Sequence, residues 1–340
     1  MVPTPAELLE VARVVDIPLR VPFRGLTRRE AVLLEGPRGW AEFAPFVEYP
    51  DAEATSWLAS AVEAGWAGPP APVRRTVEVN ATVPAVPATE VSSVLRVFPG
   101  ARTAKVKVAA DGQDLAQDCA RVAAVRETMG PGASIRVDAN GAWDLTQARR
   151  ALRALSVYRL EYAEQPVAEV EDLARLRVAL ARDGLEVPVA ADESIRRASD
   201  PAAVARAQAA DLVVVKVAPL GGIRRALRIV ADCGLPAVVS SALDTSVGIA
   251  TGVELAASLP ALPHACGLGT MALFDGDVAS SSLIPVEGVL TLEQAHRSAA
   301  SVDVELLQRH RAAPARARWW RERLARCAEI YVAETSGTFS

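Results

Sequence analysis

Short apolar runs alternate with longer amphipathic stretches between about residues 76 and 270. Eight runs have the length and composition of buried strands: TVEVNATV, RTAKVKV, SIRVDAN, RLEYAEQP, VPVAADES, DLVVVKVAP, AVVSSAL and PHACGLG. Between them, the apolar spacing predicts helices near 113–129, 144–155, 169–182, 221–232 and 246–257. These connections are too long for hairpin turns, so the strands are expected to run parallel.

Eight such units in about 195 residues predict an α/β fold built on a (β/α)8-type barrel. A doubly wound sheet is the alternative architecture, and it would call for a glycine-rich phosphate turn after an early strand. The chain contains no GxGxxG sequence. We therefore expect residues 76–270 to form a catalytic barrel.

The two ends of the chain lack this period. Residues 1–75 contain the alternating segments VVDIPLRVPF, EAVLLEG and GWAEFAPF, then a helical pattern near 52–64 and a proline-rich joint. They predict the N-terminal part of an α+β capping domain. We expect residues 271–340, with an amphipathic helix near 315–333, to pack back on that domain.

Composition limits the possible partners. Net charge is −4, and no cluster of basic residues interleaved with aromatics suggests nucleic-acid binding. No apolar run approaches the roughly 18 residues of a membrane span, and the N-terminus lacks the basic region of a secretory signal. Four widely spaced cysteines indicate reduced, structural thiols. We expect a cytoplasmic protein with a small-molecule partner; the oligomeric state stays open, and a monomer is compatible with the sequence.

Only three of the 37 basic residues are lysines, namely Lys105, Lys107 and Lys216. Arginine does not lose its proton in proteins, whereas a lysine amine can be tuned to act as a base. Any one of these lysines, taken alone, is adequately explained as a solvent-exposed residue that happens not to be an arginine. The three together become informative only when their positions are compared with those of the acids.

Ionisable residues end five consecutive apolar runs: Lys107, Asp138, Glu164, Asp192 and Lys216. Successive members are 31, 26, 28 and 24 residues apart, which is about one strand-helix unit each time. The carboxyl ends of barrel strands share one rim, and barrel enzymes keep their active sites there. The spacing therefore predicts that all five side chains meet at that rim.

Three carboxylates at one place repel one another unless a cation lies between them. With no His or Cys at ligand spacing, the all-oxygen set of Asp138, Glu164 and Asp192 suits Mg²⁺, with Mn²⁺ as a substitute. Lys107 and Lys216 would flank the ion. The predicted chemistry is removal of a proton next to a substrate carboxylate by a lysine of lowered pKa, with the ion stabilising the resulting enediolate.

Six further residues are candidates for substrate contacts: Lys105, Asn140, Ser240, Ser241, Gly267 and Arg24. Lys105 either lowers the pKa of the nearby base or fixes the carboxylates. Asn140 either orients the site or forms a turn. The serines and Gly267 follow the last two runs, where hydroxyl or backbone groups are placed to meet a substrate carboxylate.

Five motifs resemble the metal and acid-base pattern of the enolase superfamily, muconate-lactonizing subgroup. They are K-x-K at 105–107, VDAN at 137–140, E-Q-P at 164–166, A-D-E-S at 191–194 and V-V-V-K at 213–216. The resemblance implies that the three acids bind Mg²⁺, that Lys107 is the principal base, and that Lys216 lies on the opposite face. It also implies a capping-domain loop, expected near residues 21–27, that closes over the substrate.

Within this subgroup, VPFRGLTRREAVLLEG, GWAEFAPFVEY, VNATVPAV, SSALDTSVGIA and HACGLGT resemble the actinobacterial type of o-succinylbenzoate synthases. That likeness implies a lyase of menaquinone biosynthesis. Its reaction would be the Mg-dependent syn dehydration of 2-succinyl-6-hydroxy-2,4-cyclohexadiene-1-carboxylate to o-succinylbenzoate. Lys107 would remove the proton and help hydroxide depart, and Lys216 would stabilise the developing anion.

Other activities share part of this pattern. Racemases of N-acylamino acids and dipeptide epimerases of the same subgroup use two opposed lysines, which the residues alone do not separate from one-base dehydration. Dipeptide epimerases usually carry D-x-D at the eighth strand, where this chain has CGLGT. A Schiff-base aldolase acting through Lys216 and a non-catalytic barrel that binds an acidic ligand are alternatives from other classes.

Overall fold

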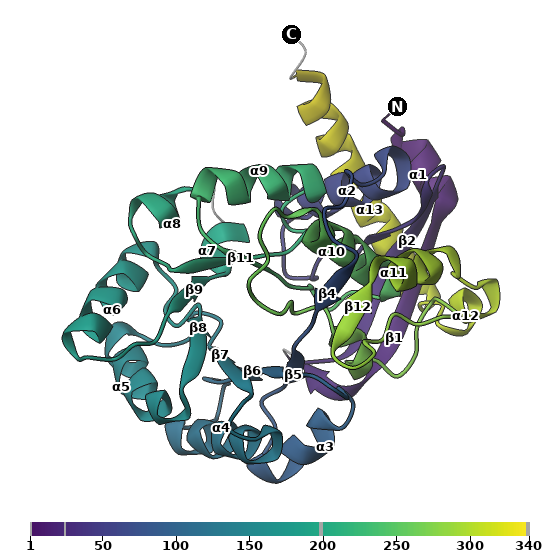
Figure 1. Ribbon diagram of the computed structural model, residues 1–340. Helices are drawn as coiled ribbons and strands as arrows, with labels where there is room; N and C mark the ends of the chain where they lie inside the picture. The colour runs from purple at the N-terminus through teal and green to yellow at the C-terminus, as the bar shows by residue number, and fades with distance from the viewer. Residues whose placement is uncertain (1, 24, 197–199, 338–340) are drawn as a thin grey trace.

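A computed structural model describes residues 2–23, 25–196 and 200–337 (Figure 1). Seven strands form one curled parallel sheet in the order β11-β10-β9-β8-β7-β6-β5. They are β5 (Ala81–Val83), β6 (Thr103–Lys107), β7 (Ser134–Asp138), β8 (Leu160–Glu164), β9 (Val189–Ala191), β10 (Leu212–Val215) and β11 (Ala237–Val239). The predicted barrel-type α/β fold with an N-terminal capping domain is confirmed.

The five predicted connecting helices are present within two residues of their expected bounds. They are α4 (Leu115–Met129), α5 (Leu145–Leu155), α6 (Val170–Arg182), α9 (Ile223–Cys233) and α10 (Ser246–Ser258). Figure 1 shows α4, α5 and α6 along the outside of the sheet. Asp114 and Asp144 start α4 and α5 through capping boxes, which satisfy the free N–H groups of the first turn. The loops that follow β6 and β7 therefore end at defined helix starts.

The remaining connections are made of short elements. These are η1 (Glu63–Ala67), η2 (Ala88–Glu90), α3 (Val91–Leu95), η3 (Ser156–Tyr158), α7 (Glu193–Arg196), α8 (Ala203–Arg206), η4 (Thr270–Leu273) and α12 (Val304–Arg309).

The first apolar run is divided between two sheets, although it was expected to form one strand. Residues 76–78 form β4 (Thr76–Glu78), which pairs antiparallel with β12 (Val289–Thr291), and only β5 joins the barrel. The tail thus contacts the barrel as well as the N-terminal domain, because α11 (Leu292–Ala300) follows β12 and packs on α10.

The eighth run does not form a regular β-strand. Instead, residues 266 and 267 make isolated parallel bridges to Val79 and Ser240, at the two open edges of the sheet. The Asn80 N–H donates to the Cys266 carbonyl (2.9 Å), and the Gly267 N–H donates to the Val239 carbonyl (2.8 Å). A proline at 263 and glycines at 267 and 269 leave little regular strand, yet these bridges close the barrel.

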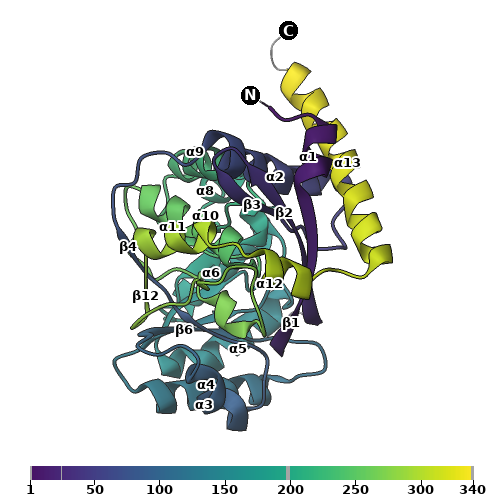
Figure 2. The same ribbon diagram turned by 90° about the vertical axis from the view of Figure 1, so that its right-hand side faces the viewer.

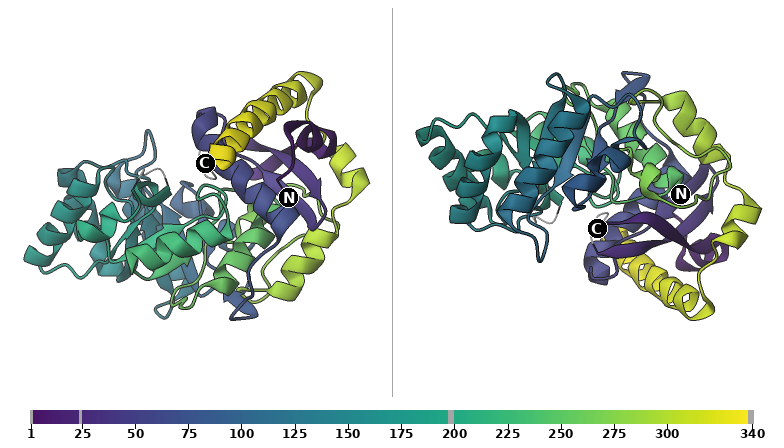
Figure 3. Two further views of the ribbon diagram at one scale, coloured as in Figure 1. Left: turned by 90° about the horizontal axis from the view of Figure 1, so that it is seen from above. Right: turned by 90° about the horizontal axis from the view of Figure 1, so that it is seen from below.

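The N-terminal domain is an antiparallel sheet of β1 (Ala12–Phe23), β2 (Leu26–Gly36) and β3 (Gly39–Phe43), with α1 (Pro5–Val11) and α2 (Asp51–Val62). The last helix, α13 (Pro314–Gly337), lies alongside α1 and α2 (Figures 2 and 3). Trp320 is fully buried, and its indole N–H donates to Glu30 on β2 (3.0 Å). The domain boundaries at 75 and 270 stay predictions.

Two expectations from composition can be compared with the structure. Over the described ranges, no helix has both the length and the apolar character needed to cross a bilayer. All four cysteines are free thiols, and three of them are buried.

Candidate active site

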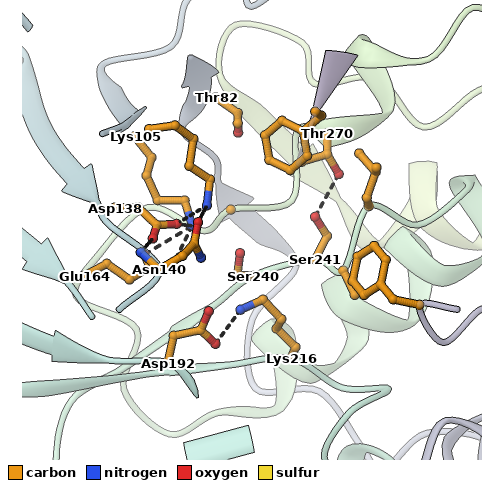
Figure 4. A pocket seen from close by; sticks show the side chains of 16 residues that line it. Thr82, Lys105, Asp138, Asn140, Glu164, Asp192, Lys216, Ser240, Ser241 and Thr270 are labelled. Carbon is orange, nitrogen blue, oxygen red and sulfur yellow. Dashed lines mark hydrogen bonds and ion pairs between the residues drawn. The ribbon is translucent and has the colours of Figure 1, made fainter. Parts of the chain in front are cut away.

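The structure brings the five predicted rim residues to one cavity. Lys107, Asp138 and Glu164 are the last residues of β6, β7 and β8, and they are aligned with one another in the strand register. Asp192 and Lys216 follow β9 and β10 directly. All five line a cavity that encloses about 430 Å³ between atoms, including its open mouth (Figure 4).

Each buried carboxylate in the cavity faces a lysine ammonium. Lys105 Nζ lies 2.9 Å from Glu164 Oε1 and 3.4 Å from Asp138 Oδ2. Lys107 pairs with Asp138, and Lys216 pairs with Asp192. Figure 4 shows the Asp192–Lys216 pair facing Lys105, Asp138 and Glu164 across the cavity. Charges of both signs are therefore held out of water at one place.

Lys105 and Lys107 are two residues apart, but their environments shift their pKa values in opposite directions. Burial lowers the pKa of Lys107; Asp138 opposes this effect, and the neighbouring Lys105 cation adds to it. Burial also acts on Lys105, but the charges of Glu164 and Asp138 outweigh it and raise the pKa of Lys105. Lys105 is therefore a permanent cation, and Lys107 is the better suited of the two to give up its proton.

The carboxylates are affected by the same crowding. Burial, together with the charge of Asp138, raises the pKa of Glu164 to about 7. Burial also favours the neutral form of Asp138, but Lys107 and Lys105 outweigh it and lower the Asp138 pKa. At Asp192, Lys216 and Arg196 lower the pKa against burial. Three carboxylates at this depth need cationic partners to stay ionised.

The donor set fits a hard divalent cation in its chemistry. Asp138, Glu164 and Asp192 are all at most 2% exposed, offer only oxygen, and come from adjoining strands. Among the described residues, however, no group of three or more His, Cys, Asp or Glu side chains is assembled closely enough to hold an ion. Instead, the carboxylates form ion pairs with the lysine ammonium groups. To bind one ion together, the three acidic side chains would have to turn toward it.

Asn140 and Gln165 support the acids from within the barrel, both with positive φ values (+48° and +37°). Asn140 Oδ1 accepts a hydrogen bond from Lys107 Nζ (2.7 Å). Gln165 Oε1 accepts from the Asp192 and Ser194 N–H groups, at 2.9 and 3.2 Å. Gln165 therefore fixes the ends of β8 and β9 relative to each other. In the sequence, Gln165 is visible only as the middle residue of E-Q-P, and nothing there indicates its burial beside two rim acids.

Arg196 links the rim to the capping domain. Its Nη1 donates to Tyr49 Oη (2.6 Å), and its Nη2 donates to Glu193 Oε1 (2.7 Å). Its Nε lies 3.4 Å from Asp192 Oδ1. This arginine was not predicted as a site residue, because its partner Tyr49 lies 147 residues away in the chain.

The predicted substrate contacts Ser240, Ser241 and Gly267 also line the cavity. Two further hydroxyl residues, Thr82 and Thr270, lie beside them, and the Ser241 and Thr270 hydroxyl oxygens are 2.7 Å apart. Of these two, only Thr82 had no predicted role. These residues come from β5, from the end of β11 and from the closing segment around 267.

Apolar residues complete the lining of the cavity: Phe23, Phe46, Ala242 and Leu243. Phe23 ends β1, and its ring centroid lies 5.6 Å from Lys107 Nζ. The hairpin between β1 and β2 thus brings part of the expected loop, residues 21–27, to the cavity. Arg24, another predicted contact, lies outside the described residues. His264, from the eighth apolar run, is not among the residues that line the cavity; its Nδ1 lies 2.7 Å from Glu161 Oε1, near the start of β8.

Comparison with known proteins gives the family. A model described as enolase C-terminal domain-like matches residues 91–296, and an enolase N-terminal domain-like model matches residues 14–65. The chain belongs to the enolase superfamily. It is 53% identical over 327 residues to an o-succinylbenzoate synthase of Mycobacterium tuberculosis (strain ATCC 25177 / H37Ra), covering 96% of each chain. It is 52% identical to that of Mycobacterium ulcerans (strain Agy99), covering 96% of this chain and 97% of the relative.

Solved structures of superfamily members share the fold. A muconate lactonizing enzyme from Pseudomonas fluorescens, complexed with muconolactone, superposes with a TM-score of 0.75 at 22% identity, covering 88% of this chain and 98% of that one. An N-succinyl Arg/Lys racemase from Bacillus cereus gives 0.73 at 18% identity, covering 89% and 97%. At these identities the likeness shows the architecture alone.

Proposed function

We propose that this superfamily member is an o-succinylbenzoate synthase that dehydrates 2-succinyl-6-hydroxy-2,4-cyclohexadiene-1-carboxylate to o-succinylbenzoate. The observation that carries the proposal is 53% identity to a curated synthase over 96% of both chains. The cavity supports it, because its lysines and buried acids suit removal of a proton next to a carboxylate. The proposed setting is the cytoplasm and menaquinone biosynthesis, with a small carboxylate as partner.

Asp138, Glu164 and Asp192 would hold the divalent ion, with Mg²⁺ as the proposed species and Mn²⁺ as its substitute. When bound, the ion supplies Lewis-acid stabilisation of the negative charge that develops on the substrate carboxylate. With the acids neutralised in this way, Lys107 would no longer be needed as the counter-ion of Asp138. Its lowered pKa then favours the neutral amine that a base requires.

Lys107 would act twice on one face of the ring. As a neutral amine, its Nζ takes the proton from the ring carbon that bears the carboxylate. As an ammonium, it returns that proton to the leaving hydroxyl group. One C–H and one C–O bond break, the ring gains a double bond and becomes aromatic, and water departs. Asn140 would keep Nζ in place through the 2.7 Å contact. Lys216, paired with Asp192, would counter the developing negative charge as a cation.

Racemisation of N-acylamino acids is the second candidate activity. The specific observation that favours it is the placement of lysines on both β6 and the end of β10, at separate positions around one cavity. Lys107 and Lys216 would then exchange protons with opposite faces of one carbon.

Both activities can be assayed on one preparation. With Mg²⁺, the purified protein is expected to convert the cyclohexadiene acid to o-succinylbenzoate, to lose the activity with a chelator, and to regain it when Mg²⁺ is restored. Incubation of N-succinyl amino acids in deuterated water reports any α-proton exchange. Exchange without dehydration would overturn the proposed function in favour of a racemase. Activity that survives complete chelation would contradict the proposed metal site.

A further inference from the structure

Thr82 carries a buried hydroxyl group that the fold leaves unused. It lies in the middle of β5, is 2% exposed and lines the cavity. Its Oγ1 is buried and has no hydrogen-bond partner among the described residues. Figure 4 shows this hydroxyl directed into the cavity, between Lys105 and the Ser241–Thr270 pair. In the described part of the cavity lining, it is the only hydroxyl whose oxygen is both fully buried and without a hydrogen-bond partner.

A buried hydroxyl without a partner destabilises the folded chain, because the group loses its hydrogen bonds to water. Valine has nearly the same shape and would fill this position without that cost. Ser241 and Thr270 differ from Thr82 because their hydroxyl groups already bond to each other. Thr82 therefore has a donor that is uncommitted until something enters the cavity.

The position of Thr82 indicates which part of a ligand it would meet. The ionisable residues come from β6 to β10, and they would take the ring carboxylate and the reacting carbons. Thr82 belongs to the neighbouring strand β5, paired in register with Lys105, on the side where hydroxyl groups and Gly267 line the wall. A substrate whose carboxylate faces the acids would direct its side arm toward this wall.

We propose that Thr82 Oγ1 donates a hydrogen bond to an oxygen of the substrate's succinyl arm and thereby selects substrates that carry such an arm. The inference rests on the proposed function, since it takes its ligand from that reaction. The acceptor is an oxygen of the arm, either its ketone or its terminal carboxylate. Because the Thr82 hydroxyl is neutral, it can donate this hydrogen bond without placing another charge beside Lys105 and Lys107.

The first test replaces only the hydroxyl. Thr82→Val is expected to raise KM for the cyclohexadiene acid about tenfold with little change in kcat, because the lost contact is present in both ground and transition states. Thr82→Ser keeps the hydroxyl and should restore KM. Thr103→Val is the matched control: Thr103 is a buried threonine at the start of β6, outside the cavity lining. An unchanged KM in Thr82→Val, or an equal rise in the control, would overturn the proposal.

The second test uses binding, so it does not depend on turnover. Titration with Mg²⁺ and o-succinylbenzoate should show about tenfold weaker binding to Thr82→Val. Benzoate, which lacks the arm, should bind the variant and the wild type equally. 2-Butanoylbenzoate lacks the terminal carboxylate, and 2-(3-carboxypropyl)benzoate lacks the ketone; the analogue that does not respond to the substitution identifies the acceptor. Equal weakening of benzoate would contradict a contact to the arm.

Stability separates binding from folding. Because the hydroxyl is unsatisfied without ligand, Thr82→Val should have a melting temperature at least equal to that of the wild type. If this variant does not fold, Thr82→Ala gives the same ligand comparison, and a loss of folding there too would overturn the proposal. Wild-type protein that binds o-succinylbenzoate but fails to dehydrate its precursor would refute the proposed function alone. Normal turnover with no effect at Thr82 would refute this inference alone.

Discussion

The rim of the barrel has two halves of different chemistry. On β6 to β10, an ionisable residue stands at or directly after the end of every strand, and lysines and acids are paired out of water. On β5, β11 and the closing segment around 267, the cavity wall consists of hydroxyl groups, a glycine and apolar side chains. The charged half supplies groups with displaced pKa values, which acid-base chemistry requires. The neutral half can supply only shape and hydrogen bonds, which suits recognition.

The two halves are also supported differently. Gln165 and the strand register hold the charged half from within the barrel. The capping domain holds the neutral half, because Arg29 Nε donates to the Leu243 carbonyl (2.9 Å) and Glu42 accepts from the Thr245 N–H (3.0 Å). Leu243 has a positive φ of +62°, so external contacts maintain an uncommon backbone conformation there. Apart from the Tyr49–Arg196 contact, which reaches Asp192, changes in the capping domain should therefore affect recognition before they affect chemistry.

The largest expected effect comes from removing a carboxylate of the charged half. Asp192→Asn should lower turnover about 1,000-fold, because the ion's stabilisation is worth several kcal/mol. Mg²⁺ affinity, measured by titration calorimetry, should fall in parallel. Asp183→Asn, directly after α6 and outside the cavity lining, is the control and should leave both unchanged. Normal Mg²⁺ affinity in Asp192→Asn would remove this acid from the proposed ligand set.

The next effect is a shift in pH dependence. A neighbouring cation disfavours protonated Lys107, so removal of the Lys105 charge should raise the Lys107 pKa. In Lys105→Met, the acid limb of the kcat/KM profile should move to higher pH. Lys105→Arg keeps the cation and should move it much less. A shift toward lower pH, or the same shift in both variants, would show that Lys105 does not act on Lys107 through its charge.

A smaller effect is expected in the neutral half. Ser241→Ala should raise KM about fivefold while Mg²⁺ affinity and kcat stay nearly unchanged, because one neutral hydrogen bond is lost. The hydroxyl groups of Ser241 and Thr270 are bonded to each other. Thr270→Val should therefore raise KM less in the Ser241→Ala variant than in the wild type. A fall in Mg²⁺ affinity in either variant would mean that the two halves are not functionally separate.

The last effect is on stability and concerns the support of the neutral half. Burial and the charge of Asp244 raise the pKa of Glu42 to about 8. Between pH 5 and 8 the unfolded chain has lost this proton and the folded chain still holds it, so wild-type stability should fall as pH rises. Glu42→Gln removes that dependence. Relative to the wild type, the variant should gain about 3 kcal/mol in unfolding free energy from pH 5 to pH 8, since each unit of pH in this window changes the balance by about 1.4 kcal/mol. A difference in unfolding free energy between Glu42→Gln and the wild type that stays constant from pH 5 to pH 8 would contradict this prediction.

The sequence predicted most of the charged half, because its residues are tied to a regular period. Lys107, Asp138 and Glu164 end strands that are one strand-helix unit apart, so the repeat itself places them on one rim. The first and eighth runs do not follow that period. In the first run, one strand pairing ends at residue 78 and another begins at residue 81; in the eighth, residues 266 and 267 form only isolated bridges.

Contacts between distant parts of the chain were not predictable in this way. Arg29 reaches a carbonyl 214 residues away, and Arg196 reaches a tyrosine in the other domain. Thr82 is one threonine among several until its burial beside the cavity is known. Periodicity sets which face of an element a residue occupies, but the packing of separate elements decides which of these residues meet.

The most direct test of the division is Lys107→Arg, which keeps a cation beside Asp138 and removes the only amine proposed as the base. The account predicts that turnover of the cyclohexadiene acid falls at least about 1,000-fold, within the range ascribed to a positioned base. Binding of Mn²⁺, followed by electron paramagnetic resonance, should stay within about threefold of the wild type, a difference of less than 1 kcal/mol. A variant that turns over at the wild-type rate would contradict the assignment of chemistry to Lys107.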